Sequence, residues 1–468
     1  MKELQELTKL AAPDSLWIVG GFLRDALLGR SSADVDLAVK GDAEKLARRF
    51  ARRTGGSVFA LDRERGVYRV TREGKTFDFA ALQGPTIEKD LARRDFTVNA
   101  MAMPVDEFLV SGAAGRLLDP HGGKKDLKAR RLRAVSEKGL LEDPLRLLRA
   151  IRQSAELEFS IAPATWVLLR CHARRIRRAA PERVREELLK ICETPRAAKA
   201  ARDLDRAGLL AVLWPESEKL RRVAHDFYGR NGVLGHSLDV VASFERVLES
   251  LPVLFPSFHK PLAAHLRELV SGHPRAALLK LGALLHDAGK PSTSEKGKDG
   301  KPHFHGHEHV GAKLAAKAAG RWRMSKEETR ILMRVVRGHM RPGNLGNVPV
   351  LTDRAIYRFY RDFEQDSVSV LVVALGDHFA YLSERVRAAG KDPVYRAIRR
   401  MLGNYFLKKE TVAPPKIVDG HAIMKFLKIK PGPKVGEILE GIREAQAAGK
   451  VKTAEEALAL GRKLIKRL

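Results

Sequence analysis

Two aspartates alternate with apolar residues in the segment DVDLAV, which begins at Asp34. Alternate residues of a β-strand share a face, so Asp34 and Asp36 are expected to point one way and the intervening Val35 the other. Two carboxylates held side by side repel each other, and burying either one without a partner costs several kcal/mol. A bound divalent cation would remove this conflict. The segment therefore predicts a strand with a metal site on one face.

A diglycine precedes this segment. Gly20 and Gly21 end a predicted strand and open the helical run FLRDALLG. Glycine permits close backbone approach, and the amides at a helix N-terminus attract phosphate. A triphosphate on this turn would lie beside a carboxylate-bound metal pair, which can activate an attacking hydroxyl and stabilise a leaving pyrophosphate. Asp78, in TFDFAAL, is either a third carboxylate of the cluster or an edge-strand aspartate that faces solvent.

The pattern of apolar residues changes along the chain. Residues 15–135 mix short β-like runs with helical stretches such as 42–53, whereas the sequence from Leu140 onward is almost wholly helical. The β-like runs are LWIVGG, VDLAV, VYRV, TFDFAAL and RLLD. We expect an α+β fold, with a small mixed sheet followed by helical domains. The predicted divisions are residues 1–135, 136–215, 216–400 and 401–468.

The charge of the chain indicates a polyanionic partner. Its 86 Lys and Arg exceed its 57 Asp and Glu, for a formal net charge of +29. Phosphate contacts by such residues release condensed counterions, although the same balance can simply aid solubility. The 2 cysteines in 468 residues argue against a disulfide scaffold. With no apolar run of membrane-span length, we expect a cytoplasmic protein with no membrane partner.

Five motifs occur in the order seen in bacterial tRNA nucleotidyltransferases, the CCA-adding enzymes and their poly(A) polymerase relatives. They are GGFLRDALLG…DVD, RRDFTVNAMA (93–102), LLDPHGGKKDL (117–127), EDPLRLLRAIR (142–152) and ERVREE (182–187). The resemblance covers roughly the first 215 residues. It implies a polymerase β-like head followed by an all-α neck and body. It also implies template-independent addition of CMP, and of AMP, to tRNA 3′ ends from CTP and ATP.

The resemblance also implies roles for individual residues. Asp34 and Asp36 would hold Mg²⁺ in a two-metal site, and Gly20, Gly21 and Arg24 would line the triphosphate. The sugar and phosphate region would be shaped by Arg93, Arg94, Asp95 and Asn99, the base would be read by Asp143 and Arg146, and Arg149 and Arg152 would complete the nucleotide site.

Asp143 and Arg146 have a physical reason to read a base. Residues three apart share one face of a helix. A carboxylate acceptor and a guanidinium donor fork can together match the Watson–Crick edge of C or A. The alternative is an ordinary surface ion pair, worth a few tenths of a kcal/mol.

The segment between TFDFAAL and EKDL is short. Full CCA-adding relatives carry a longer flexible segment there, which is associated with switching from C to A addition. The short form resembles enzymes that add only CC, so a CC-adding activity is our hypothesis. The alternatives are a poly(A) polymerase and, without catalysis, an RNA-binding protein with degenerate sites.

A second cluster of candidate ligands lies further along the chain. His236, His286, Asp287 and Asp377 are similar to the H…HD…D pattern of the HD phosphohydrolase domain, and LLHDAGKP adds Lys290. A single histidine on an apolar helix is more often a core residue, but four ordered ligands favour a divalent metal.

The HD resemblance carries further implications. The domain would bind Ni²⁺, Mn²⁺ or Mg²⁺ and act as a 2′,3′-cyclic phosphodiesterase or phosphatase. His307 and His339 are candidates for further ligands, whereas His305 and His309 are equally well explained as loop histidines. The remaining helical tail, residues 417–468, is either an RNA contact or a packing module.

Overall fold

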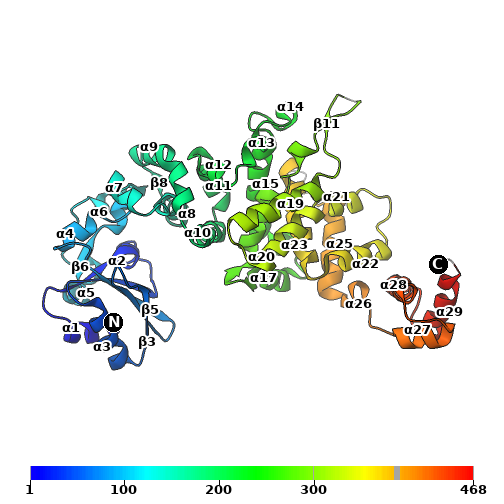
Figure 1. Ribbon diagram of the computed structural model, residues 1–468, viewed down its shortest axis with the longest axis horizontal. Helices are drawn as coiled ribbons and strands as arrows, with labels where there is room; N and C mark the ends of the chain where they lie inside the picture. Colours follow the sequence, from blue (N-terminus) through cyan, green and yellow to red (C-terminus); the bar gives the residue numbers. More distant parts are fainter. Residues whose placement is uncertain (1, 299, 384–389, 467–468) are drawn as a thin grey trace. The chain divides into compact units, whose positions relative to one another are not determined.

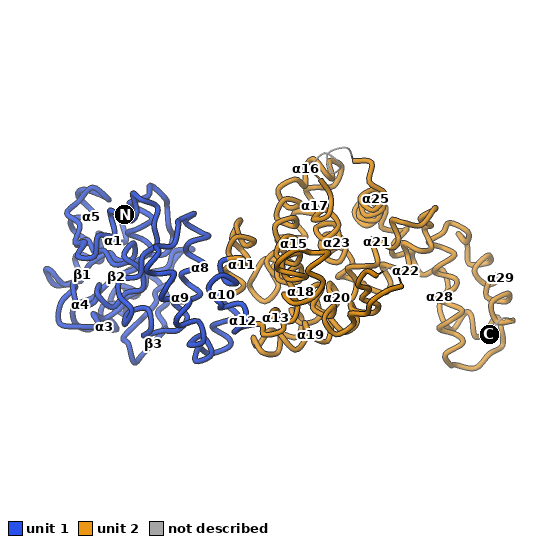
Figure 2. Tube along the Cα trace, turned by 90° about the horizontal axis from the view of Figure 1, so that it is seen from above, with its two compact units in different colours: residues 1–187, 203–213 blue, residues 188–202, 214–468 orange. Residues whose placement is uncertain are grey.

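The computed structural model describes residues 2–298, 300–383 and 390–466. The chain divides into two compact units (Figure 2). Unit 1 comprises residues 1–187 and 203–213, and unit 2 comprises residues 188–202 and 214–468.

Unit 1 is built on a six-stranded sheet of order β3-β4-β5-β2-β1-β6 (Figure 1). Strands β2 and β5 are parallel and the other neighbours are antiparallel, which confirms the predicted mixed sheet. The strands are β1 (Leu16–Val19), β2 (Asp34–Val39), β3 (Ser57–Asp62), β4 (Val67–Arg72), β5 (Lys75–Ala81) and β6 (Ala102–Pro104).

The sequence patterns missed two of these strands and predicted one that does not form. β3 and β6 were not predicted. Gly55 and Gly56 mark the end of α3, but the run SVFALD after them was not recognised as a strand, and β6 is only three residues long. RLLD does not form a strand. Only Leu118 pairs, in an isolated bridge in which it exchanges both backbone hydrogen bonds with Ala102.

The two faces of the sheet differ in chemistry. One face is covered by α3 (Ala43–Thr54), which packs in turn against α1 (Lys2–Leu10), and Phe50 of α3 packs against Phe77 at a ring distance of 5.0 Å. The opposite face carries Asp34, Asp36 and Asp78 and is called the aspartate face below. The sheet therefore has one dry face and one face with ionisable groups.

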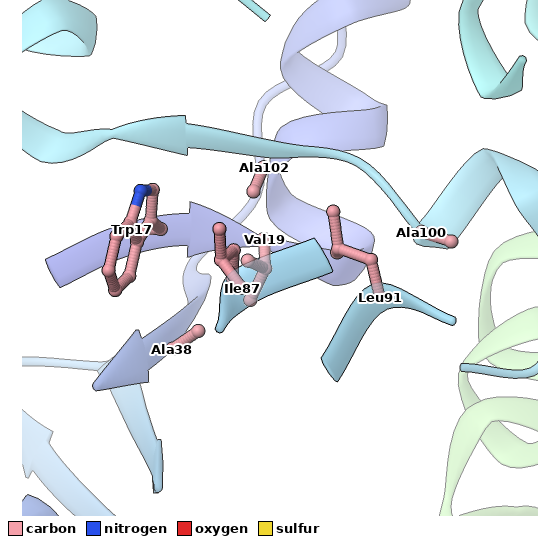
Figure 3. Close-up of a cluster of buried hydrophobic side chains, with 7 residues drawn as sticks. All are labelled: Trp17, Val19, Ala38, Ile87, Leu91, Ala100 and Ala102. Atoms are coloured by element: carbon pink, nitrogen blue, oxygen red, sulfur yellow. The ribbon is translucent and has the colours of Figure 1, made fainter. Parts of the chain in front are cut away.

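A second apolar cluster fixes elements to part of the aspartate face (Figure 3). Its members are Trp17, Val19, Ala38, Ile87, Leu91, Ala100 and Ala102. Ala38 follows Asp36 by two residues on β2, so the two side chains point to the same face of the sheet. The cluster anchors α4 (Ile87–Leu91) and the turn η1 (Thr97–Asn99) beside the carboxylates.

The rest of unit 1 is helical, as predicted, apart from the two-residue strands β7 (Arg131–Leu132) and β8 (Ser160–Ile161). Its helices are α2 (Gly20–Leu27), α5 (Val105–Ser111), α6 (Gly123–Lys128), α7 (Glu137–Glu142), α8 (Arg146–Leu157), α9 (Pro163–His172) and α12 (Leu209–Leu213), while α10 (Pro181–Glu193) and α11 (Ala197–Arg206) contribute residues to both units.

Unit 2 is a helical assembly with two short ribbons, β9 (Leu269–Val270) with β10 (His273–Pro274) and β11 (Glu295–Lys296) with β12 (Pro302–His303). Its longer helices are α15 (Gly232–Glu249), α17 (His259–Arg267), α18 (Arg275–Leu285), α19 (His307–Arg321), α20 (Lys326–Gly338), α22 (Asp353–Phe363), α23 (Ser367–Tyr381) and α25 (Pro393–Leu407). The shorter ones are α13 (Ser217–Arg221), α14 (His225–Tyr228), α16 (Leu251–Leu254), α21 (Met340–Gly346) and α26 (Lys409–Val412). Together with the sheet of unit 1, this confirms the α+β class.

The end of the chain forms α27 (Gly420–Leu427), α28 (Pro433–Ala447) and α29 (Ala454–Ile465). These helices enclose an apolar core that includes Ile423 and Ile438. Glu444 of α28 is buried and accepts hydrogen bonds from Arg354 and Arg358 of α22 at 2.6 and 2.5 Å. Among the described residues, no helix combines the length and apolar character needed to cross a bilayer.

Candidate active site

The two aspartates of β2 lie beside the diglycine turn. Asp36 Oδ2 accepts hydrogen bonds from the backbone amides of Gly21, at 2.8 Å, and Phe22, at 3.3 Å. These amides belong to the first turn of α2. Asp34 lies on the same face of β2, two residues earlier, and accepts a hydrogen bond from the Thr76 hydroxyl. The geometry predicted for this pair is therefore present.

Only glycine fits the start of α2. Gly20 has φ +64°, and a Cβ there would lie 2.7 Å from Asp36 Oδ2. Any other side chain would push the carboxylate away from the helix terminus. Burial raises the pKa of Asp36, while the nearby Arg94 opposes the shift. Burial therefore makes the ionised form of Asp36 unfavourable, and a bound cation would offset this free-energy cost.

Asp78 joins the same face. It pairs in register with Asp36 across the parallel β2–β5 contact. The alternative interpretation, an edge-strand aspartate that faces solvent, is wrong, because β5 is flanked by β4 and β2. Asp78 instead forms a bidentate ion pair with Arg69 of β4, with two N–O distances of 2.6 Å. Arg69 was not identified from sequence, although the VYRV–TFDFAAL hairpin places it directly opposite Asp78.

These residues border a cavity of about 610 Å³ in unit 1. Nearly all of the predicted head-site residues line it, namely Gly20, Gly21, Arg24, Asp34, Asp36, Asp78, Arg93, Arg94, Asp95, Asn99, Arg146, Arg149 and Arg152. The lining also includes polar residues that sequence reasoning did not identify, namely Asp25, Arg65, Arg69, Asp90, Glu142, Gln153 and Glu156.

Asn99 is the centre of a hydrogen-bond network in this cavity. Its side-chain amide donates to Asp95 Oδ1 and to Gln153 Oε1, each at 3.0 Å, and its oxygen accepts from Arg24 Nη1 at 2.9 Å. Arg149 pairs with Asp95 at 2.7 Å. Burial disfavours the charge on Asp95, but Arg149 and Asn99 together hold its pKa below the ordinary value.

Asn99→Ala is expected to destabilise the protein by about 2 kcal/mol, because it leaves buried donors and acceptors without partners. Urea unfolding followed by circular dichroism measures this change. Asn99→Asp should be at least as destabilising, because it replaces the amide that donates to Asp95 by a second buried carboxylate. Equal unfolding midpoints for wild type and Asn99→Ala would contradict the assigned network.

Three further arginines of the cavity each have a carboxylate partner. Arg93 pairs with Glu142 at 3.1 Å and Arg94 pairs with Asp90 at 3.1 Å. The guanidinium of Arg152 contacts Glu187 at 2.8 Å and Glu156 at 2.9 Å. These pairs hold the guanidinium groups in place at the cavity wall.

The prediction that Asp143 and Arg146 share a helix face is wrong. Arg146 begins α8, but Asp143 lies before it in extended backbone, at φ −131°. Asp143 accepts a hydrogen bond from Arg183 at 2.7 Å and is not part of the cavity lining. Arg146 donates to the backbone carbonyls of Arg93 and Gly139. The helix pattern could not show that α8 begins after Pro144, where proline disfavours a helical conformation for the preceding residue.

A second cluster lies within unit 2, where helix ends converge. His236 is on α15 and Asp377 on α23, while His286 and His339 follow the ends of α18 and α20. His236 Nε2 lies 3.0 Å from Asp377 Oδ1, and His286 Nε2 lies 3.6 Å from the same oxygen. All four predicted ligands, including Asp287, are therefore brought together.

His307 and His339 belong to the same cluster. His307 Nε2 lies 3.3 Å from Asp287 Oδ1, and His339 Nε2 lies 3.7 Å from it. The Nδ1 atoms of both rings lie 2.7 Å from backbone carbonyls, where each would donate its proton. In a neutral ring the other nitrogen is then an acceptor. Of the other two candidates, His305 lies in a turn and stacks on His303, which fits a loop histidine. His309 is exposed but lies in the first turn of α19, so the interpretation as a loop histidine is wrong for it.

The donor set of this cluster fits a metal. The two acceptor nitrogens, His307 Nε2 and His339 Nε2, face each other at only 3.2 Å. Two lone pairs at this distance repel unless a cation lies between or beside them. Backbone carbonyls that fix Nδ1 are also the usual support of a metal-bound histidine. Imidazole and carboxylate together suit a divalent transition metal.

Comparison with known proteins identifies the chain's relatives. The Poly A polymerase head domain matches residues 16–86 and 71–133, the probable RNA and SrmB-binding site of polymerase A matches 158–220, and the HD domain matches 233–382. The A-adding tRNA nucleotidyltransferase of Deinococcus radiodurans is 35% identical over 454 residues, covering 96% of this chain and 95% of the relative. The chain belongs to the tRNA nucleotidyltransferase family.

Other tRNA nucleotidyltransferases are nearly as similar. The CC-adding enzyme of Thermus thermophilus is 34% identical over 455 residues, which cover 96% of this chain and 93% of the relative. A solved CCA-adding enzyme with ATP has a TM-score of 0.69 at 22% identity, over 99% of this chain and 94% of that one. A Thermotoga maritima CCA-adding enzyme complexed with tRNA has a TM-score of 0.64 at 21% identity, over 100% and 95%. These structures share the overall fold of this chain, and the family matches confirm the head and the HD domain within it.

Proposed function

We propose that the head of this enzyme adds CMP to the 3′ end of tRNA, with CTP as donor and pyrophosphate as product. The observation that carries the proposal is the contact between Asp36 and the Gly21 amide at 2.8 Å, with Asp34 and Asp78 on the same face. Carboxylate oxygens are the ligands that Mg²⁺ prefers, so Asp34 and Asp36, with Asp78, would hold it. When bound, Mg²⁺ activates the attacking hydroxyl and neutralises the leaving group.

The residues around the carboxylates would bind the nucleotide. Gly20 and Gly21 would let the triphosphate approach the start of α2 closely, beside the Gly21 and Phe22 amides that donate to Asp36, and Arg24 would add a guanidinium. Asp95 and Asn99 would position the sugar, and Arg149 would support them through its ion pair with Asp95. Arg93, Arg94 and Arg152 would contribute positive charge to the wall of the pocket. Each would do so while held by its carboxylate partner.

Base selection is proposed to involve Arg146 and Asp143, although not as a preformed pair. Arg146 is tied to two carbonyls and Asp143 to Arg183. A base edge would therefore have to displace existing partners. Protein groups would in this way read the incoming base without a template.

The choice of CMP rests on the segment between β5 and α4. β5 ends at Ala81 and α4 begins at Ile87. Gln83 fixes this segment, because its backbone amide donates to Asp90 at 3.0 Å and its side chain donates to the Arg65 carbonyl at 2.9 Å. The segment is short and tied down, which favours addition of CC over a switch to A. Relatives with either specificity are similar over nearly the whole chain, so overall similarity does not decide it.

Three tRNA substrates test this proposal, ending before the CCA, after the first C and after CC. Each is incubated with CTP, ATP or both, and the products are resolved on a sequencing gel. We expect two C additions to the first tRNA, one to the second and none to the third. Efficient A addition to the third tRNA would contradict the CC-only assignment, and an open-ended A tail would instead indicate a poly(A) polymerase. That alternative has less support among the relatives.

We propose a phosphohydrolase activity for the HD domain. His236, His286, Asp287 and Asp377 would hold Ni²⁺, Mn²⁺ or Mg²⁺, with His307 and His339 as further ligands. The bound metal would supply an activated water for hydrolysis of a phosphate ester. Lys290, whose ammonium lies 2.6 Å from Asp287 and 2.7 Å from the Tyr228 hydroxyl, would face the phosphate. A 2′,3′-cyclic phosphate at a damaged RNA end is the proposed substrate.

The four predicted divisions of the chain are proposed as functional parts. Residues 1–135 would form the nucleotidyltransferase head and 136–215 the RNA-binding neck and body. Residues 216–400 would form the HD domain and 401–468 the helical tail. A tRNA substrate in the cytoplasm fits the strongly positive charge of the chain.

A further inference from the structure

The aspartate face continues past the cavity to the edge of the sheet. β3, the first strand in the sheet order, carries Phe59 and Leu61, each 46% exposed. Phe59 pairs with Arg69, and Arg69 pairs with Asp78. Directly opposed residues of neighbouring strands point to the same face. The exposed ring of Phe59 therefore stands on the aspartate face, next to the guanidinium that holds Asp78.

The order of the strands places the diglycine turn and the strands β5, β4 and β3 on opposite sides of β2. The diglycine turn follows β1, on one side of β2, whereas β5, β4 and β3 lie on the other side. In phosphoryl transfer the attacking and leaving oxygens lie roughly in line. If the β- and γ-phosphates of the nucleotide leave as pyrophosphate towards the N-terminus of α2, the hydroxyl that attacks the α-phosphate must approach from the side of β5. The RNA that carries the attacking 3′ hydroxyl would then lie over β5, β4 and β3.

The distance from the carboxylates to Phe59 suits a nucleotide. Neighbouring strands are about 4.8 Å apart, so the backbone of Phe59 lies about 10 Å from that of Asp78, with β4 between them. A nucleoside whose 3′ oxygen is at the carboxylates can extend its base over this interval. Arg65 and Arg69 line the cavity along the way.

The composition of this strip matches single-stranded nucleic acid. Aromatic rings on which bases stack, combined with basic residues along the backbone, are the recurring elements of sites for single strands. Phe59 supplies the ring. Arg65 and Arg69 supply guanidinium groups, which also pair with Asp62 and Asp78. An exposed edge strand could also pair with another protein, but the two arginines and the continuity with the carboxylates favour RNA.

We propose that Phe59 is the stacking platform for the 3′-terminal base of the acceptor RNA, with Arg65 and Arg69 facing its phosphates. The site would position the attacking hydroxyl at Asp78, opposite the nucleotide side of the cavity. This inference rests on the proposed nucleotidyl transfer and assigns the acceptor to a place on the sheet. It also gives a role to β3, one of the two strands that the sequence patterns did not reveal.

Steady-state kinetics with a tRNA lacking its CCA end test the proposal. Loss of one stacked base predicts a roughly 5- to 100-fold rise in the KM for tRNA in Phe59→Ala. The KM for CTP should stay within about twofold of wild type, because the ring lies away from the triphosphate side. Phe59→Trp should restore the tRNA KM, whereas Phe59→Leu, which is apolar without a ring to stack, should behave like Phe59→Ala.

Val110→Ala is the matched control, since Val110 is an exposed apolar residue of unit 1, 88% exposed, on α5. It should leave both KM values unchanged.

Nucleotide addition by wild type is the reference, so its absence would refute the proposed function itself. If wild type is active and Phe59→Ala has the same tRNA KM, the acceptor platform is refuted, and a protein partner on β3 becomes the explanation for the exposed ring. A rise in the CTP KM equal to that for tRNA would also refute it.

Discussion

Asp36→Asn is expected to reduce the kcat of nucleotide addition roughly 1,000-fold or more. The change removes the negative charge from the centre of the aspartate face and keeps a side-chain oxygen for the Gly21 amide. A metal held by the remaining carboxylates would be misplaced, and a misplaced metal loses several kcal/mol of transition-state stabilisation. The KM for tRNA should change little, because no tRNA contact has been removed.

The folded state of this variant should be preserved. Burial raises the pKa of Asp36, so the ionised carboxylate is unfavourable in the metal-free protein. Replacing it by a neutral amide of similar shape should leave the melting temperature unchanged or higher. Asp106→Asn, an exposed acid of α5, is the matched control and should retain full activity. Activity of Asp36→Asn within tenfold of wild type would remove this residue from the catalytic role.

Asp287→Asn should abolish metal binding and hydrolysis of 2′,3′-cyclic AMP at the HD site while nucleotide addition continues. Asp287 lies within 4 Å of ring nitrogens of four histidines, His236, His286, His307 and His339. Loss of a ligand should exceed the 10- to 100-fold effect usual for residues that only support ligands, so we expect more than roughly 100-fold loss of hydrolysis. Metal content after chelation and reloading, measured by mass spectrometry, gives a second readout.

A stability effect must be separated from metal loss in this variant. Asp287→Asn leaves the buried ammonium of Lys290 without its carboxylate, which is destabilising in itself. His307→Gln removes a ligand nitrogen and leaves Lys290 paired with Asp287, so it should lose metal with a smaller change in melting temperature. His309→Ala, in the same helix but exposed, should keep both metal and hydrolysis. Full hydrolysis by Asp287→Asn or His307→Gln would contradict the assigned site.

The alternation of acids along β2 was sufficient to predict the centre of the head site. A strand fixes the relative direction of Asp34 and Asp36 through local geometry alone, and the diglycine marks the adjacent helix terminus. The HD ligands, which come from separate helices, were predicted through their resemblance to the H…HD…D pattern rather than from local geometry. Local patterns thus recovered the residues whose chemistry depends on their own element.

Partners on other elements were not accessible to this reasoning. Arg69 faces Asp78 only because β4 and β5 pair in one particular register, and Gln153 reaches Asn99 only because α8 packs beside η1. The supposed pairing of Asp143 with Arg146 failed for a related reason. Spacing assumed one continuous helix, whereas Pro144 separates α7 from α8. Tertiary register, rather than propensity, decides each of these contacts.

The most direct test of the central claim is a crystal structure of the enzyme with Mn²⁺ and a non-hydrolysable CTP analogue. Anomalous scattering identifies Mn²⁺ independently of the protein. We predict an anomalous peak between Asp34 and Asp36, with the triphosphate at the N-terminus of α2. Manganese confined to the histidine cluster of unit 2, or a triphosphate bound away from Gly20 and Gly21, would contradict the assignment of the aspartate face as the site of nucleotidyl transfer.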